Sequence, residues 1–287
     1  MRATSKLAVL LAGLAALAMV PASTAPQVGV ANPCTPIEGL SLSPPQTADL
    51  PLPVVVHYMV RTGSRHDVSR EISPAMLQDV FSDRGRLVAI WHQATIRPYL
   101  HRVEKCTISF SAFGIPVGEA EELPSPARTA DAKNLFRRIN ENFNARDISA
   151  LDLYVWWGIN TVAGYGDRHL DSGRLRAGAA WMDTDCRASD SCDLLVTHEI
   201  GHFLGLCHAC TIGAPLAGVP CARCLPDRMR QPDGSFVLAK CTSVRGPRLM
   251  RDDNLLLLEP HKVNGTELSD CERKLAKSFA TRRVGTR

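Results

Sequence analysis

The chain of 287 residues has little net charge and few aromatic side chains. Its 33 Lys and Arg residues nearly balance 29 Asp and Glu residues, which gives a formal charge of +4, and Phe, Trp and Tyr make up only 6% of the residues. A nucleic-acid interface needs a clustered basic face with aromatic platforms, whereas the arginines here are scattered along the chain. We therefore expect no nucleic-acid partner.

Long apolar runs are also scarce, and the one that stands out lies at the start. Residues 7–20 are apolar, follow Arg2 and Lys6, and precede the small residues of 21–25. This order is typical of a cleaved signal peptide, and the run is shorter than the roughly 20 residues of a transmembrane helix. We expect residues 1–22 to be a signal peptide and the mature chain to be secreted or periplasmic, without stable membrane insertion. Loss of Arg2 and Lys6 lowers the formal charge from +4 to +2.

Cysteine, in contrast, is abundant. All ten cysteines lie beyond the expected signal peptide, and an even set in an exported chain indicates disulfide bonds. Cys186 and Cys192 bracket five residues and are expected to close a small loop. A disulfide is also the expected state of Cys34.

The remaining sequence predicts one α+β domain at residues 51–287 behind a flexible arm at 23–50 that is rich in Pro, Ala, Ser and Thr. Runs of β-branched and aromatic residues predict strands, and apolar residues at helical spacing predict helices. Strands are expected at 53–60, 107–113, 151–157 and 176–183, with a loop at 164–167. Helices are expected at 74–91 with Ser73 as N-cap and an interruption at Gly85, at 131–144, and at 266–277 with a capping box of Ser269 and Glu272.

The stretch HEIGHFLGLCH, residues 198–208, carries the chemistry. His198 and His202 are four residues apart, nearly one helical turn, so both imidazoles can reach one ion from the same helix face. If the helix continued to His208, that third imidazole would point away from the ion. Gly205 can end the helix because glycine accepts a positive φ, and His208 can then return as the third ligand.

Three nitrogen ligands leave the fourth position of a tetrahedral zinc ion open, as in catalytic zinc sites. Zinc would lower the pKa of a water molecule there to about 7, and Glu199 would act as the general base that takes its proton. The alternative interpretation is a set of histidines on a solvated helix. It explains neither the third histidine nor the glutamate between the first two.

The pattern HExxHxxGxxH resembles the zinc signature of the metzincin metalloendopeptidases. The resemblance implies a twisted mixed sheet with long helices, an active-site helix, and a C-terminal subdomain with a closing helix and a Met-turn whose methionine lies beneath the metal. Met250, beside the turn residues Gly246 and Pro247, is the expected methionine, and Met229 is the alternative. Residues 176–183 resemble the edge strand to which a peptide substrate adds, with an ordinary internal strand as the open alternative.

Two CxxC pairs leave the subfamily open between archaemetzincin-like and matrixin-like. Cys207, Cys210, Cys221 and Cys224 are similar to the cysteines that hold a second, structural zinc in archaemetzincins. Export favours two disulfides over that second zinc. Residues 223–227 echo the cysteine-switch segment of matrix metalloproteinases, yet they follow the zinc helix instead of preceding it.

Together these features predict an exported zinc metalloprotease, a hydrolase that cleaves peptide bonds in protein or peptide substrates. The expected metal ligands are His198, His202 and His208, the expected catalytic residue is Glu199, and Gly205 and Met250 are expected to support the site. One alternative is a zinc amidase or deacetylase that acts on small-molecule or cell-wall amides. The other is a non-catalytic binding module that keeps zinc for stability.

Overall fold

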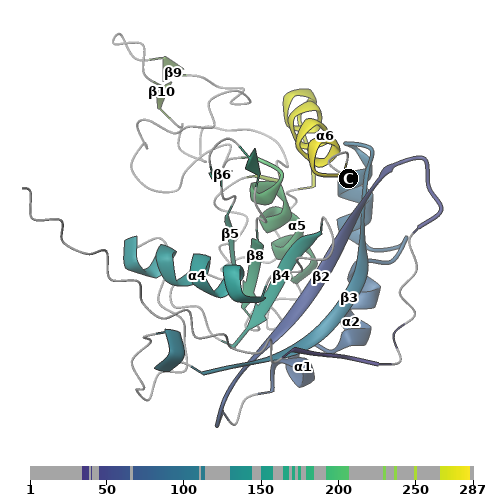
Figure 1. Ribbon diagram of the computed structural model, residues 1–287. Coiled ribbons are helices and arrows are strands. Elements are labelled where there is room, and N and C mark those ends of the chain that lie inside the picture. Colours follow the sequence, from purple (N-terminus) through teal and green to yellow (C-terminus); the bar gives the residue numbers. More distant parts are fainter. Residues whose placement is uncertain are drawn as a thin grey trace, which may run out of the picture. The chain divides into compact units, whose positions relative to one another are not determined.

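The computed structural model describes the parts of the chain that build a mixed sheet and the helices around it (Figure 1). The described residues are 34–38, 40, 45–64, 67–109, 111–113, 130–143, 150–157, 164–167, 170–171, 174–175, 179–183, 192–206, 229–230, 236–237, 249–250 and 266–284. All of them belong to one unit, residues 32–287. The expected signal peptide, residues 1–22, lies outside them.

Six strands form the main sheet in the order β1-β3-β2-β4-β8-β5. They are β1 (Cys34–Pro36), β2 (Leu50–Arg61), β3 (Ile96–Ile108), β4 (Leu151–Trp156), β5 (Gly164–Asp167) and β8 (Ala179–Asp183). The four inner strands run parallel, and β1 and β5 are antiparallel at the two edges. Two short hairpins pair β6 (Leu170–Asp171) with β7 (Arg174–Leu175) and β9 (Met229–Arg230) with β10 (Phe236–Val237).

Helices cover both faces of the sheet, so the fold is a mixed α/β arrangement. The helices are α1 (Val68–Glu71), α2 (Pro74–Val80), α3 (Arg86–His92), α4 (Ala130–Phe143), α5 (Cys192–Phe203) and α6 (Asp270–Val284), with a 3₁₀ turn at Ser111–Phe113. α4 packs on one face, as Figure 1 shows, through a cluster that includes Phe136, Ile139 and Tyr154. The other five contribute to a larger cluster on the opposite face. The mixed sheet expected from the sequence is confirmed, while the parts specific to metzincins stay a prediction.

β2 is the central strand because it can be buried on both sides. Residues 52–59 are all buried, which its run of valines allows, since parallel strands covered on both faces are apolar nearly throughout. Alternate side chains reach opposite faces. Val56 and Tyr58 belong to the larger cluster, and Met59 belongs to the α4 cluster.

A β-bulge in β3 changes which of its side chains reach each face. Leu100 pairs with Val54 and Arg102 pairs with Val55, so His101 is an extra residue on β3. Before the bulge the even-numbered Leu100 joins the larger cluster, and after it the odd-numbered Val103 does so.

The helix boundaries follow the local chemistry that the sequence indicated. The hydroxyl of Ser73 accepts a hydrogen bond from the backbone N–H of Met76, which caps α2. Residues 81–85 separate α2 from α3, and a Cβ added at Gly85 would collide with the carbonyl oxygen of Val80. The capping box of α6 is reciprocal, because Ser269 and Glu272 each bond the backbone N–H of the other.

Four expectations about strands need correction. β3 begins at Ile96, eleven residues before the expected 107, and residues 111–113 form a 3₁₀ turn. Residues 34–36, expected in the flexible arm, form edge strand β1, because a disulfide and ladder pairing fix them to β3. Residues 164–167, expected as a loop, form β5. β8 is internal, between β4 and β5, so the edge-strand interpretation of 176–183 is wrong and the internal alternative is confirmed for 179–183.

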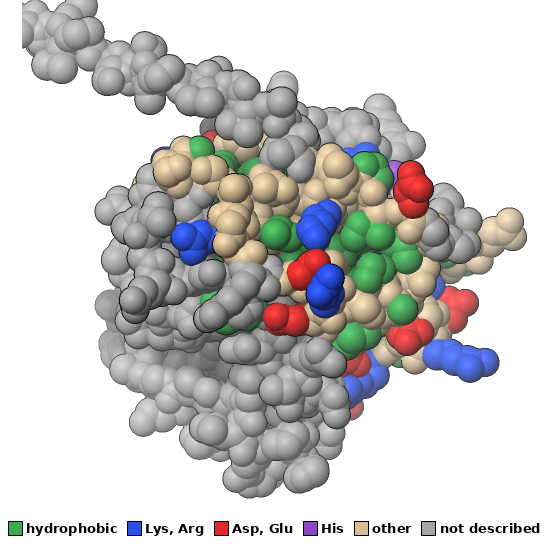
Figure 2. Space-filling view, turned by 90° about the horizontal axis from the view of Figure 1, so that it is seen from below, with side chains coloured by type: hydrophobic (Ala, Val, Ile, Leu, Met, Phe, Trp, Pro, Cys, Tyr) green, Lys and Arg blue, Asp and Glu red, His purple; other side chains and the backbone are tan. Residues whose placement is uncertain are grey.

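The described surface has no dominant charge on the face that Figure 2 shows. Acidic and basic side chains are interspersed there among apolar ones, and neither sign gathers into a patch. Within the described part of the chain, the exposed large apolar side chain is Met76, at 37%. None of the helices described here combines the length and the apolar character that crossing a membrane requires.

Candidate functional site

α5 carries the histidine motif and is fixed at its start to α3. Arg86 of α3 donates two hydrogen bonds to the carboxylate of Asp193, from Nε at 2.7 Å and Nη2 at 3.2 Å. Asp193 lies in the first turn of α5, where a negative charge is favourable for the helix dipole. Val196 and Ile200 pack into the larger core cluster. The start of α5 is therefore attached to α3, and its apolar side chains fix the helix in the core.

His198 and His202 lie side by side on one face of α5. Their ring centroids are 4.8 Å apart with the planes at 84°. Nδ1 of His198 is 3.0 Å from the carbonyl oxygen of Leu249, and Nδ1 of His202 is 3.0 Å from that of Leu206. A carbonyl can only accept, so each Nδ1 carries a proton and each Nε2 carries the lone pair. This is the tautomer in which a histidine binds a metal through Nε2.

Glu199 is buried beside the two histidines. Its side chain is only 1% exposed, and Oε2 has no hydrogen-bond partner among the described residues. Burial raises the pKa of this carboxyl well above its ordinary value. A buried carboxylate oxygen without a partner is costly. Such an oxygen fits the chemistry of a site that binds a cation and a water molecule.

The helix ends in a Schellman motif centred on Gly205. The N–H of Gly205 donates to the carbonyl of His202, and the N–H of Leu206 donates to that of Gly201. Gly205 has φ of +84°, the conformation that the sequence indicated. A Cβ at this position would also lie 2.6 Å from the ring of Phe279 in α6. The chain therefore leaves α5 in a direction that only glycine permits at low cost.

Met250 lies directly beneath the motif. It is fully buried, and a Cβ added at Gly201 would collide with its Sδ atom. Its neighbour Leu249 is held from two sides, because its carbonyl accepts from His198 and its N–H donates to the carbonyl of Glu267. Met250 therefore packs against the helix that carries the two histidines, while its place beneath a metal ion stays a prediction. The side chain of Met229, the alternative, is outside the described residues.

Several predicted site residues lie outside the described part of the chain. His208 is one of them, as are Cys186 and the four cysteines of the CxxC pairs; of Cys192 only the backbone is described. Their ligation or pairing stays a prediction. Among the described cysteines, Cys34 is bonded to Cys106, which confirms the expected disulfide of Cys34, and Cys271 is also disulfide-bonded.

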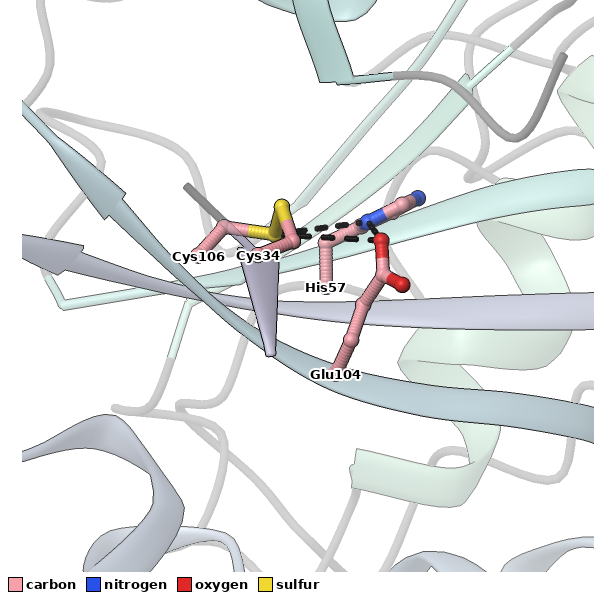
Figure 3. A group of neighbouring side chains, drawn as sticks. All are labelled: Cys34, His57, Glu104 and Cys106. Atoms are coloured by element: carbon pink, nitrogen blue, oxygen red, sulfur yellow. Dashed lines mark hydrogen bonds and ion pairs between the residues drawn. A yellow bond between two sulfur atoms is a disulfide. The ribbon is translucent and has the colours of Figure 1, made fainter. Parts of the chain in front are cut away.

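A second polar cluster, which the sequence interpretation missed, lies on the α4 face of the sheet. His57 of β2 is its centre. Nδ1 of His57 is 2.8 Å from Oε1 of Glu104, and Nε2 is 2.9 Å from Oδ1 of Asp152. Figure 3 shows His57 and Glu104 beside the disulfide of Cys34 and Cys106. The signal was present in the sequence, because His57 and Asp152 interrupt strands that are otherwise apolar.

Charge balance keeps this buried cluster together. Burial lowers the pKa of His57, but the hydrogen bonds and charges of Asp152 and Glu104 outweigh it, and the pKa lies above its ordinary value of 6.5. Arg102 adds a second positive charge 3.2 Å from Glu104. The ring of Tyr154 stacks on His57 at 4.7 Å between centroids.

A cavity of about 570 Å³ lies elsewhere, between residues 45–49, α2, α3 and the start of β3. The histidine and the arginine that line this cavity each have an acidic partner. His92 bonds Asp49 at 2.6 Å, and Arg97 bonds Asp83 at 2.6 Å. His92 is thus an exposed residue that is paired with an acidic side chain. In each pair the basic side chain is already bonded to a carboxylate, so neither pair indicates a catalytic group.

Comparisons with known proteins describe the fold only in general terms. No protein family and no curated protein sequence matches the chain. The fold resembles that of metalloproteinase-II from Bacteroides fragilis, with a TM-score of 0.38 and 14% identity over 85% of this chain and 58% of that one. It also resembles a chain of a chaperone–substrate complex, with a TM-score of 0.38 and 15% identity over 82% of this chain and 35% of that one. The chain thus spans less than two thirds of either relative, and likenesses of this size carry no argument about its chemistry.

Proposed function

We propose that the chain is an exported, zinc-dependent endopeptidase of the metzincin type that hydrolyses peptide bonds in protein substrates. One observation carries the proposal. His198 and His202 lie one helical turn apart with both Nδ1 atoms bonded to carbonyl oxygens, next to a buried oxygen of Glu199 that has no partner among the described residues. A purely structural zinc site would not need this carboxylate.

The residues present fit a zinc ion. His198, His202 and His208 would hold it, with Nε2 as the donor atom of the first two. Zinc would supply Lewis acidity, which acidifies a water molecule and polarises the carbonyl of the scissile bond. The Nδ1 hydrogen bonds would keep the two rings in position, and Met250 would close the floor of the site.

Glu199 would move the proton. In the buried site it takes a proton from the attacking water, and it later gives that proton to the amine that leaves when the peptide bond breaks. Glu199 is only 1% exposed, so bulk water has little access to its carboxylate.

The edge strand β5 would hold the substrate. Among the described strands, β5 pairs on one side only, with β8, and α5 packs against both strands. An extended peptide can add to such an edge through main-chain hydrogen bonds. The substrate would then lie beside the helix that carries Glu199.

Replacement of Glu199 by Gln tests the mechanism. We expect Glu199→Gln to keep zinc and to lose hydrolysis of an unfolded protein by about 100-fold or more, because the amide cannot take the proton. The matched control is Glu141→Gln on the exposed side of α4, which should change neither property. Full turnover by Glu199→Gln, or wild-type protein without zinc after metal is supplied, would overturn the proposal. Hydrolysis of small acetylated amides or cell-wall fragments, with no cleavage of protein, would instead favour an amidase.

Export is a separate part of the proposal and has its own test. The disulfide between Cys34 and Cys106 suits an oxidising compartment. We expect the chain in periplasmic or culture fractions, with an N-terminus at Ser23 after cleavage behind Ala22. A full-length chain retained in the cytosol would contradict export without affecting the zinc chemistry.

A further inference from the structure

We propose that reduction of the disulfide between Cys34 and Cys106 turns the His57 cluster into a second zinc site. Its four ligands are His57, Glu104, Cys34 and Cys106. The inference is independent of the proposed peptidase function, because the cluster lies on the face of the sheet opposite α5.

The donor set is one that zinc prefers. Two sulfur atoms, one imidazole nitrogen and one carboxylate oxygen lie within 4.8 Å of one another. They come from β1, β2 and β3, three neighbouring strands of the sheet. Cysteine sulfur, histidine nitrogen and glutamate oxygen are all zinc ligands in proteins, and four of them complete a closed tetrahedral site.

The distances are close to those of a tetrahedral site. Sγ of Cys106 is 3.7 Å from Nδ1 of His57 and 3.9 Å from Oε1 of Glu104. Zinc bonds of about 2.3 Å to sulfur and about 2.1 Å to nitrogen or oxygen place such atoms about 3.6 Å apart. The nitrogen and oxygen, now 2.8 Å apart, need to separate by only about 0.6 Å. The two sulfur atoms need to separate after their bond is broken.

Neighbouring charges already orient two of the ligands. Oδ1 of Asp152 lies 2.9 Å from Nε2 of His57, so Nδ1 faces the other donors. A carboxylate behind a histidine ligand is a common companion of protein zinc sites. Arg102 contacts Oε2 of Glu104 at 3.2 Å, which leaves Oε1 directed toward the cluster. These partners would hold the site in shape before zinc arrives.

The redox step is an ordinary thiol–disulfide exchange. A dithiol reductant forms its own disulfide, and its two electrons and two protons convert the bridge into the thiols of Cys34 and Cys106. Zinc then replaces the two thiol protons and the proton on Nδ1 of His57, which pass to solvent. β1 stays attached to β3 in both states, through a covalent bond in one and through the metal in the other.

Zinc counting on matched proteins tests the proposal. The full chain is stripped of metal, reduced with a phosphine, freed of reductant under inert gas and titrated with zinc, and the same is done with Cys34→Ser/Cys106→Ser. We expect the reduced wild type to bind one zinc per chain more than the reduced double variant, and the two oxidised proteins to bind equal amounts. Cobalt in place of zinc should show more thiolate charge-transfer absorption in the reduced wild type.

Two further variants separate this site from the other cysteines. Glu104→Gln should weaken the additional zinc at least tenfold, because it removes the anionic oxygen ligand. Cys271→Ser removes another disulfide cysteine and should leave the additional zinc unchanged. Equal zinc counts in the reduced wild type and the reduced double variant would overturn the proposal. So would a reduced chain that loses its circular dichroism and does not regain it with zinc.

Discussion

Gly205 offers a sharp test of how α5, the helix that carries the two histidines, is ended. Gly205→Ala should destabilise the chain for two separable reasons, the backbone conformation and the nearby ring of Phe279. The φ of +84° favours glycine, and an added Cβ would lie 2.6 Å from the ring of Phe279. An alanine at positive φ costs about 1–2 kcal/mol, and overpacking a tight contact adds about 1–3 kcal/mol.

Gly63 provides a matched control. Its φ is +79°, yet a Cβ there would meet nothing within 4 Å. Gly63→Ala should therefore report the backbone cost alone, about 1–2 kcal/mol. Gly205→Ala should exceed it by the steric cost, about 1–3 kcal/mol.

Equilibrium unfolding in urea measures both variants, with disulfides intact and the slope of the transition compared with wild type. Equal losses in the free energy of unfolding for the two variants would refute the importance of the contact between Gly205 and Phe279. A loss of zinc from Gly205→Ala alone would link the turn to His208, the proposed third ligand that follows it.

Three other measurements follow from the structure. The raised pKa of His57 means that the folded state binds the proton of this residue more tightly than the unfolded state does. The resulting stabilisation is complete below a pH of about 6.5 and is lost as the pH rises through the folded pKa. The urea midpoint of wild type should therefore fall from pH 6 to pH 8 more than that of His57→Gln, and parallel pH curves would contradict this. Ser269→Ala should cost about 1 kcal/mol of stability through the lost cap, whereas the exposed Ser278→Ala should change it by less than about 0.5 kcal/mol; equal effects would argue against the capping box. Gly201→Ala should lower stability by about 1–3 kcal/mol, because its Cβ collides with the methionine beneath it, and a fully stable variant would show that this methionine moves freely.

Local chemistry made the helices predictable from the sequence. The N-cap at Ser73, the interruption at Gly85 and the capping box of Ser269 and Glu272 depend on neighbouring residues only, and all three are present in the structure. The histidine spacing likewise follows from the helix alone. The position of Met250 depended on the family resemblance, because a single methionine carries no local signal.

Long-range packing explains what the sequence did not reveal. β3 carries Arg97, His101, Arg102, Glu104 and Lys105 in a strand that the apolar pattern could not indicate. Several of these polar groups have partners on other segments, such as Asp83 for Arg97, and such partners appear only after folding. β5 was hidden for a related reason, since its two glycines are typical of a loop and its strand form depends on pairing with β8.

The His57 cluster needed three strands to be aligned before it could be recognised. His57 pairs in register with Glu104 on one side and with Tyr154 on the other. No two of these residues are close in sequence. A single histidine in an apolar strand indicated burial, yet it gave no indication of its partners.

The β-bulge at His101 has a consequence for how this chain could have arisen. Removing that one residue would restore plain alternation in β3 without turning any later side chain, because Leu100 and Val103 would then be two positions apart on the same face. Glu104 and Cys106 would still face His57, and Val103 would still belong to the larger cluster. The loss or gain of this single codon therefore leaves the cysteine, histidine and glutamate constellation in place, whereas a one-residue change between Val103 and Cys106 that no bulge absorbs would turn one part of it to the opposite face. Among related chains, we expect the extra residue to be present or absent independently of Cys34.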